Sequence, residues 1–219
     1  SDLYFPSWWN SRNRQTPSQV WEDLRKMNAD FIHIPHQLAD TGNVPTDWNF
    51  HDEVAQPVAE IFQTRGSYEY YGAPRQAPRS VPGKGYYLQD AWAREIVIGV
   101  IASPDHGGGY GKACVYSKDL SRESILEAFR ARRCSGTTAA KIFVDARFNG
   151  HLMGEKLTET AGEQMKVDVE VRAPTPIDKI EVCRNNKFIA TRKVNGRDAK
   201  VTITDSTPPA GRCYYYVRV

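Results

Sequence analysis

The pattern of hydrophobic and polar positions changes near residue 141, and its two parts predict different structures. Before this point, short apolar runs alternate with amphipathic stretches such as "SRESILEAFRARR". Beyond it, apolar and polar residues alternate with period two in "MKVDVEVRA" and "KVTITD", separated by turn signals such as "PTP" and "NG". The first pattern predicts alternating helices and strands, and the second predicts half-buried antiparallel strands. We therefore expect an α/β domain over residues 1–145 and an all-β, immunoglobulin-like sandwich over residues 146–219.

The first domain is predicted to contain three helices. One has a clear start, because Thr16 can cap it, Pro17 occupies the first helical position, and Gln19 completes a capping box. This helix continues through "VWEDLRKM". The other two are "YYLQDAWARE" and the amphipathic "SRESILEAFRARR". Between the helices, "DFIHIP", "PVAEIFQ" and the apolar run "IVIGVIAS" predict short buried strands of the kind found in parallel sheets.

Residues with metal-binding side chains occur in or directly after each of these strands. His36 follows the first, Glu60 lies inside the second, and Asp105 and His106 follow the third. The carboxyl ends of parallel strands meet at one edge of a sheet, and carboxylates and imidazoles are common ligands of divalent metals. We therefore expect these four residues to form a metal site, with His36 about 4–8 Å from Asp105 or His106.

Structural roles remain open for several of these residues. Glu60 can be a buried carboxylate paired with an arginine such as Arg65, and Asp105 can cap its turn. His33 is three residues before His36, so strand alternation puts the two on opposite faces. We expect His33 to be a buried, hydrogen-bonded histidine outside the metal site.

The motifs at these positions resemble a known superfamily. Five segments match the C-terminal half of bacterial proteins of the PHP (polymerase and histidinol phosphatase) superfamily, in a branch described only as PHP-like or metal-dependent phosphoesterases. These segments are "FIHIPHQ", "TDWNFHDE", "VAEIFQTRGSYEYYGAPR", "IGVIASPDHGG" and "LSRESILEAFRARRCSGTT…FNGHLMGE". The resemblance implies the C-terminal portion of a distorted α/β barrel that holds two or three metals at its rim. It implies that His36, Asp105 and His106 are ligands, whereas the role of Glu60 stays open.

The chain departs from the superfamily pattern in two ways. No His-x-His pair occurs in the 219 residues, and Asp105 and His106 are adjacent instead of separated by one residue. The resemblance therefore implies a C-terminal part that lacks the N-terminal half of the barrel, with little activity of its own.

The leading functional hypothesis is a metal-dependent hydrolase of small phosphoesters, using Zn, Mn or Mg. Arg65, Arg75 and Lys112 are the candidate residues for binding the substrate phosphate, since guanidinium groups suit bidentate capture of phosphate oxygens. One alternative is a non-catalytic module that binds a glycan or a protein through its β-sandwich. Another is the same metal site acting on a different ester or an amide.

Composition and charge limit the classes of partner and the cellular locations that the sequence predicts. The net charge is +3 with the basic residues spread out, so a nucleic-acid partner is not predicted, and no window has the roughly 18 apolar residues of a membrane helix. The four cysteines show no CxxC spacing. Cys183 and Cys213 lie in alternating segments and can approach each other. A bridge between them would favour an exported location over a cytoplasmic one.

Overall fold

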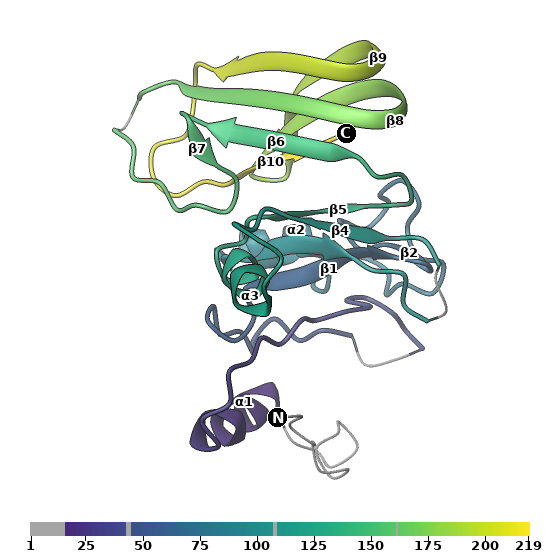
Figure 1. The fold of residues 1–219 in the computed structure, drawn as a ribbon, viewed down its shortest axis with the longest axis vertical. Helices are drawn as coiled ribbons and strands as arrows, with labels where there is room; N and C mark the ends of the chain where they lie inside the picture. Colours follow the sequence, from purple (N-terminus) through teal and green to yellow (C-terminus); the bar gives the residue numbers. More distant parts are fainter. Residues whose placement is uncertain (1–15, 43–44, 107–108, 161) are drawn as a thin grey trace.

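The computed structural model describes residues 16–42, 45–106, 109–160 and 162–219. Helix α1 (Pro17–Lys26) lies at one end of the molecule, a mixed region of short strands and two helices lies in the middle, and a β-sheet forms the other end (Figure 1). Among the described residues, no helix is long and apolar enough to cross a membrane.

The start of α1 is the one that the sequence predicts. The backbone N–H of Gln19 donates to the Thr16 hydroxyl at 3.4 Å, and the Thr16 N–H donates to the Gln19 side chain at 2.8 Å. This reciprocal pair satisfies backbone donors that a helix end otherwise leaves unpaired. Trp21 and Leu24 form the buried face of the helix.

The middle region is built around two parallel strands. β1 (Val58–Gln63) pairs in parallel with β3 (Gly99–Ala102), and β2 (Gly66–Ser67) pairs antiparallel with β1. A separate antiparallel pair joins β4 (Lys112–Val115) to β5 (Cys134–Thr137). Helices α2 (Leu88–Ala93) and α3 (Arg122–Arg130) are shorter than the sequence segments that predict them.

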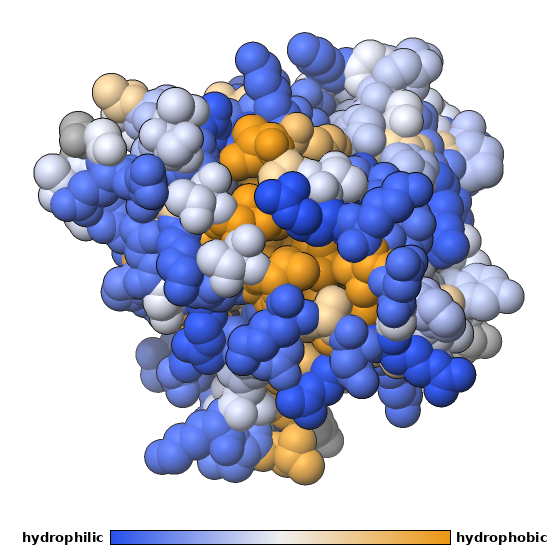
Figure 2. Space-filling view, turned by 90° about the horizontal axis from the view of Figure 1, so that it is seen from above, coloured by the Kyte–Doolittle hydropathy of each residue, from blue (hydrophilic) through white to orange (hydrophobic). Residues whose placement is uncertain are grey.

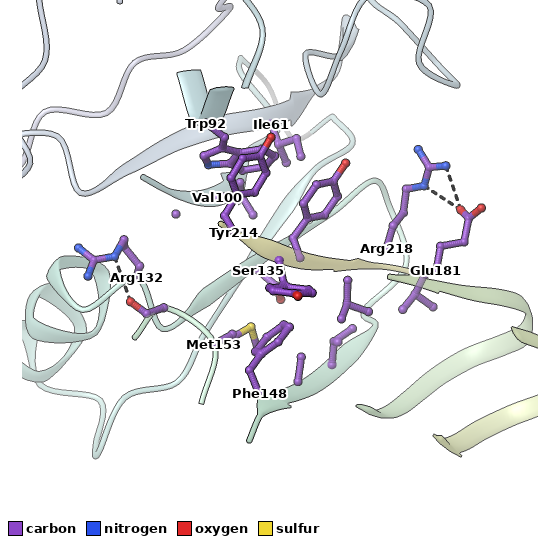
Figure 3. Close-up of a pocket in the computed structure, with 18 of the residues that line it drawn as sticks. Ile61, Trp92, Val100, Arg132, Ser135, Phe148, Met153, Glu181, Tyr214 and Arg218 are labelled. Carbon is purple, nitrogen blue, oxygen red and sulfur yellow. Dashed lines mark hydrogen bonds and ion pairs between the residues drawn. The ribbon is translucent and has the colours of Figure 1, made fainter. Parts of the chain in front are cut away.

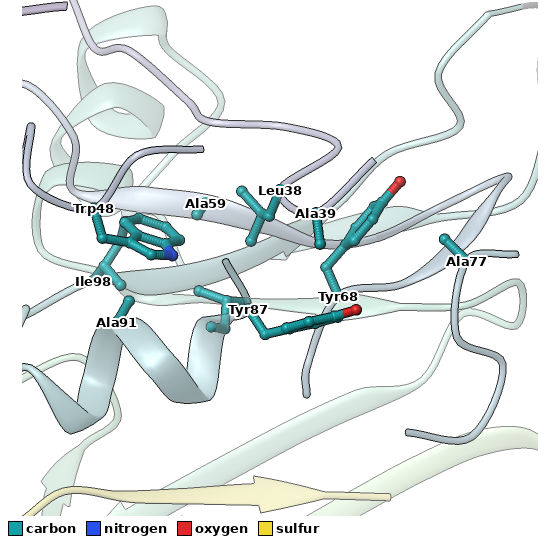
Figure 4. Close-up of a cluster of buried hydrophobic side chains, with 10 residues drawn as sticks. Leu38, Ala39, Trp48, Ala59, Tyr68, Ala77, Tyr87, Ala91 and Ile98 are labelled. Carbon is teal, nitrogen blue, oxygen red and sulfur yellow. The ribbon is translucent and has the colours of Figure 1, made fainter. Parts of the chain in front are cut away.

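Loop residues supply much of the core of the middle region (Figure 4). Leu38 and Trp48 come from segments without regular structure, and Tyr68 follows β2; all three are at most 3% exposed. They pack with Ala59 of β1 and Leu88 of α2. The long segment after β2 is therefore an ordered part of the fold, as its tyrosine content suggests.

The C-terminal end is one five-stranded antiparallel sheet. β6 (Phe143–Phe148) and β7 (His151–Leu152) are followed by two long strands, β8 (Met165–Arg184) and β9 (Lys187–Asp205), and by β10 (Tyr215–Arg218). The order is β10-β8-β6-β7, and β9 also pairs with β8. β10 and β6 pair with the two ends of β8, whereas β9 pairs with it along most of its length. Valines and isoleucines from both halves of β8 share one apolar core. Viewed from this end, apolar surface gathers in one area surrounded by hydrophilic side chains (Figure 2).

The predicted immunoglobulin-like sandwich is wrong in its connectivity. "PTP" at residues 174–176 and "NG" at residues 195–196 each predict a turn. The first lies inside β8 and the second inside β9, and these two long strands pair with each other. The register shifts where they meet, from Arg172 opposite Asp198 to Ile177 opposite Gly196. An irregularity of this kind tolerates a proline because it leaves ladder hydrogen bonds unmade. The prolines therefore mark a bend within one sheet and do not separate two sheets.

The predicted α/β barrel portion is also wrong. The described residues are 37% strand and 13% helix, and their strands form no closed barrel. The expected strand "DFIHIP" is extended chain beside β1. The His33 N–H donates to the Ala55 carbonyl at 2.7 Å, and the Glu60 N–H donates to the Pro35 carbonyl at 3.0 Å. These two bonds hold the segment in place without producing a regular ladder.

Candidate functional site

Three acidic side chains gather at the carboxyl ends of the two parallel strands. Glu60 lies in β1 opposite Ile101 of β3, Asp105 follows the end of β3, and Asp40 comes from the segment after His36. Asp40 is 1% exposed and Glu60 is 3% exposed. We call Asp40, Glu60 and Asp105 the acidic cluster.

Glu60 is buried in the acidic cluster and, within the described ranges, makes no ion pair with an arginine or lysine. One carboxylate oxygen accepts the backbone N–H of Gln37 at 3.2 Å, and the other accepts the hydroxyl of Ser103. Burial raises the pKa of Glu60. The two hydrogen bonds and nearby His36 oppose this rise, and the charge of Asp105 adds to it. Glu60 therefore retains a proton to higher pH than an exposed glutamate does.

Two arginines and a histidine surround the other two carboxylates. Arg65 Nη2 lies 3.4 Å from Asp105 Oδ2, and its Nη1 lies 3.8 Å from Asp40 Oδ2. Arg79 approaches Asp40 at 3.4 Å. His106 Nε2 lies 3.4 Å from Asp105 Oδ1, with its side chain 94% exposed. The site is thus a mixed-charge cluster that opens toward solvent at its histidine side.

Two further features of the site are energetically costly. The Tyr68 hydroxyl is buried and has no hydrogen-bond partner within the described part of the chain. Burial, with Asp40 and Glu60 nearby, raises the pKa of Tyr68. Gln37 and Asp105 adopt positive φ angles of 53° and 60°, a conformation that side chains other than glycine occupy rarely. Unpaired buried polar groups and unusual backbone angles are often found at binding and catalytic sites.

The structure brings most of the sequence-predicted site residues together. Asp105 contacts Arg65 and His106 directly, and both His36 and Asp105 act electrostatically on Glu60. The 4–8 Å separation of His36 from Asp105 or His106 stays a prediction.

Arg75 and Lys112, the other two predicted phosphate-binding residues, have different surroundings. Arg75 is exposed and donates to the Thr138 hydroxyl at 2.8 Å. Lys112 is exposed on β4, where it pairs with Thr137. Neither takes part in the hydrogen bonds and ion pairs described above for the acidic cluster.

Sequence reasoning missed Asp40, Tyr68 and Arg79. Asp40 was detectable in principle, because a carboxylate directly after the apolar pair Leu38 and Ala39 is costly to bury without a role. Tyr68 and Arg79 carry no such local signal. Their positions depend on how the segment after β2 folds back over β1.

His33 is hydrogen-bonded as expected, but it is exposed and not buried. Its Nδ1 accepts the Trp21 indole N–H at 2.9 Å and lies 3.4 Å from the Gln56 amide nitrogen. Desolvation by neighbouring protein atoms lowers the pKa of His33, and His36 contributes to the same shift. The bond to Trp21 connects α1 to the extended segment and gives His33 a structural role.

The acidic cluster has metal-binding atoms of the right type but does not make a complete metal site by itself. Within the described ranges, no three His, Cys, Asp or Glu side chains are placed to hold one ion. Both Glu60 oxygens already accept hydrogen bonds, and the two Asp105 oxygens face Arg65 and His106. A divalent ion would need ligands beyond these residues.

The four cysteines are free thiols in the structure. Cys183 is fully buried, and its partner across the β8–β10 ladder is Tyr216 and not Cys213. The structure therefore contains no disulfide bridge between Cys183 and Cys213.

Comparison with known proteins finds relatives without an assigned role. An uncharacterised protein of Chlamydia pneumoniae is 25% identical over 227 residues, covering 88% of this chain and 36% of the relative. An uncharacterised protein of Chlamydia trachomatis is 27% identical over 124 residues, covering 50% of this chain and 20% of the relative. No family model and no solved structure matches. The chain thus spans about a third or less of the length of these relatives.

Proposed function

We propose that this chain contributes part of a hydrolytic site for phosphoesters, formed around Glu60, Asp105 and His36 and completed by residues outside these 219. One observation carries the proposal: Glu60, 3% exposed within β1, lies close enough to both His36 and Asp105 for their charges to act on it. Buried carboxylates with raised pKa values are concentrated at functional sites because their cost is tolerated only where it serves a purpose.

The described residues suggest a division of roles. A bound Zn, Mn or Mg ion would supply a water molecule of lowered pKa. Asp105 and His36 are the donors best placed to contribute to holding it, because His36 is exposed and the Asp105 side chain, though mostly buried, keeps 14% of its surface accessible. Glu60 is suited to hold and transfer a proton near the site. Arg65, beside Asp105, is suited to bind a phosphoryl oxygen.

The incomplete ligand set is consistent with a site shared with other parts of a longer protein. The Chlamydia relatives are about three or more times the length that the match covers. We therefore expect the isolated 219-residue chain to bind metal weakly and to show little turnover of para-nitrophenyl phosphate.

Calorimetric titration of the isolated chain with Mn²⁺ and Zn²⁺ tests this proposal. We expect a dissociation constant no tighter than about 10 μM, weakened at least about tenfold by Asp105→Asn and by His36→Ala. The matched control is His151→Ala. This change removes a histidine of β7 that is not one of the proposed site residues and lies 3.0 Å from the Glu155 carboxylate. The control should bind metal like the wild type.

Two results would overturn the proposal. One is equal binding by the wild type and both site variants. The other is no binding at all at about 10 mM metal, since a half-site with these donors retains affinity in that range.

A further inference from the structure

A cavity separate from the acidic cluster lies between the middle region and the C-terminal sheet. Its volume is about 1350 Å³, and residues of β5, β6 and β10 line it together with the end of α2. Small-molecule sites usually measure about 300–1,000 Å³, so this cavity has room for an extended ligand. It is lined by both parts of the chain, which makes it a feature of their packing and not of either part alone.

Aromatic rings form one wall of the cavity. The Trp92 ring lies 5.6 Å from the ring of Tyr214 and 4.9 Å from that of Tyr216, measured between centroids. The Trp92 indole N–H donates to the Ile98 carbonyl at 2.9 Å, which fixes its orientation. Figure 3 shows Trp92 and Tyr214 on one side of the cavity and Phe148 and Met153 on the other. A flat ligand can therefore contact rings from two directions.

The charged side chains around the cavity are largely neutralised by one another. Arg132 lies 3.3 Å from Glu53, and Arg212 lies 2.8 Å from Glu95. Arg218 lies 2.9 Å from Glu181. The lining as a whole has six Lys or Arg and seven Asp or Glu residues, so little excess charge of either sign lies on the cavity wall. The cavity is therefore better suited to an uncharged ligand than to a phosphate or a polyamine.

Strand β5 adds hydroxyl groups that have no partner. Ser135 and Thr137 alternate with Cys134, which packs into the core, so they face the side of the cavity. Their hydroxyl oxygens are buried and lack a hydrogen-bond partner within the described ranges, and Thr137 is 9% exposed. Because these two oxygens are fully covered, they are a polar cost within the wall of the cavity, and a ligand would reach them only if the β5 side chains turned toward it.

We propose that this cavity binds a neutral oligosaccharide, with sugar rings stacked on Trp92 and Tyr214. A pyranose has a face of C–H groups that packs against aromatic rings and an edge of hydroxyls that hydrogen-bonds to polar side chains. The cavity offers both kinds of surface, and it has room for more than one sugar ring. This inference does not depend on the hydrolytic site, because it involves none of His36, Glu60 or Asp105.

Calorimetry and tryptophan fluorescence with four uncharged hexasaccharides test it: chitohexaose, cellohexaose, maltohexaose and laminarihexaose. We expect at least one to bind the isolated chain. Trp92→Phe, which retains an aromatic ring in the core, and Tyr214→Ala should each weaken binding about tenfold. The matched control is Tyr110→Ala, which removes an exposed tyrosine away from the cavity lining and should change binding less than twofold.

Far-ultraviolet circular dichroism and thermal unfolding of each variant show whether the fold is retained. Binding that falls in folded Tyr214→Ala but not in Tyr110→Ala supports the proposal. It is overturned if none of the four sugars binds at about 5 mM. It is also overturned if the cavity variants bind like the wild type, or if laurate binds and the sugars do not. Neither result bears on metal binding at the acidic cluster.

Discussion

Two groups of buried carboxylates in this chain are stabilised in opposite ways. In the first, Glu69 and Glu181 share one arginine, Arg218, whose guanidinium lies 3.0 Å and 2.9 Å from them. Burial pushes the pKa of Glu181 upward, but hydrogen bonds from Lys179 and Arg218 outweigh burial and hold it below its ordinary value. In the second group, the acidic cluster, Glu60 makes no ion pair with an arginine of the described ranges, and its pKa is raised.

The Arg218 group stabilises the fold, whereas the acidic cluster is energetically unfavourable for folding. Arg218 also lies 4.1 Å from the centroid of the Phe188 ring, and Tyr216 donates to Glu69 at 2.7 Å, so each charge in that group has several partners. These residues join the C-terminal sheet to the middle region. Within the described ranges, the acidic cluster instead has a glutamate, Glu60, without an ion pair to an arginine or lysine, and beside it lie a Tyr68 hydroxyl with no hydrogen-bond partner and two residues with positive φ. Such costs are typical of functional sites.

The largest effect that we expect is from removing the shared cation with Arg218→Leu. The change takes the arginine away from two buried carboxylates and leaves Glu69 with only the Tyr216 hydroxyl and Glu181 with Lys179. This loss should lower the free energy of unfolding by about 3–5 kcal/mol at pH 7. Urea unfolding followed by circular dichroism measures it. Glu181 has a lowered pKa in the fold, so its pairing stabilises above its ordinary pKa and is lost as the pH falls toward the lowered value. The gap between wild type and variant should therefore narrow in acid.

The control for this change is Arg212→Leu, in which the arginine pairs with Glu95 and both side chains are at least 60% exposed. Exposed pairs contribute about 1 kcal/mol or less. Equal losses for Arg218→Leu and Arg212→Leu would show that the first group is no more structural than a surface ion pair.

A smaller effect of opposite sign is expected for Glu60→Gln, measured with EDTA present. Because the folded pKa of Glu60 is raised, its contribution to stability falls as the pH rises from its ordinary pKa through the raised value. A neutral amide avoids that loss. It can still accept the Gln37 N–H and donate to the Ser103 hydroxyl. We expect the free energy of unfolding at pH 7 to rise by about 1 kcal/mol, with no gain below about pH 4.

The same substitution in the other group provides the comparison. Glu69→Gln weakens the contact with Arg218 and should destabilise the protein at pH 7. If Glu60→Gln and Glu69→Gln shift the unfolding midpoint in the same direction, the two groups do not differ in the way that we describe.

The smallest effect is expected for Arg65→Gln in the acidic cluster. The Arg65 side chain is 36% exposed, and Asp40 keeps Arg79 at 3.4 Å when Arg65 is removed. We expect a change in the free energy of unfolding within about 1 kcal/mol in the same urea assay. A loss as large as that of Arg218→Leu would mean that Arg65 is a structural cation and not one available to a ligand.

Local signals along the sequence predicted individual elements well. The Thr16–Gln19 capping box, the apolar runs of β1 and β3 and the period-two segments of β8 and β9 all correspond to observed elements. The nearness of His36 and Asp105 to Glu60 agrees with the assumption that strand ends meet at one edge, whereas the ion pair of Arg65 with Asp105 did not follow from it. These features depend on side-chain chemistry and spacing over a few residues.

The sequence by itself determined where helices start, which segments are extended and which carboxylate is costly to bury, because each depends on neighbours along the chain. Only the tertiary structure decided that "PTP" and "NG" lie within two bent strands of one sheet, since that depends on which partner strand supplies hydrogen bonds. It also decided that Arg218, 149 residues after Glu69, forms an ion pair with that glutamate, whereas no arginine in the part of the chain that the structure describes forms one with Glu60. Contacts between distant segments leave no local pattern, because they form only when the whole chain packs.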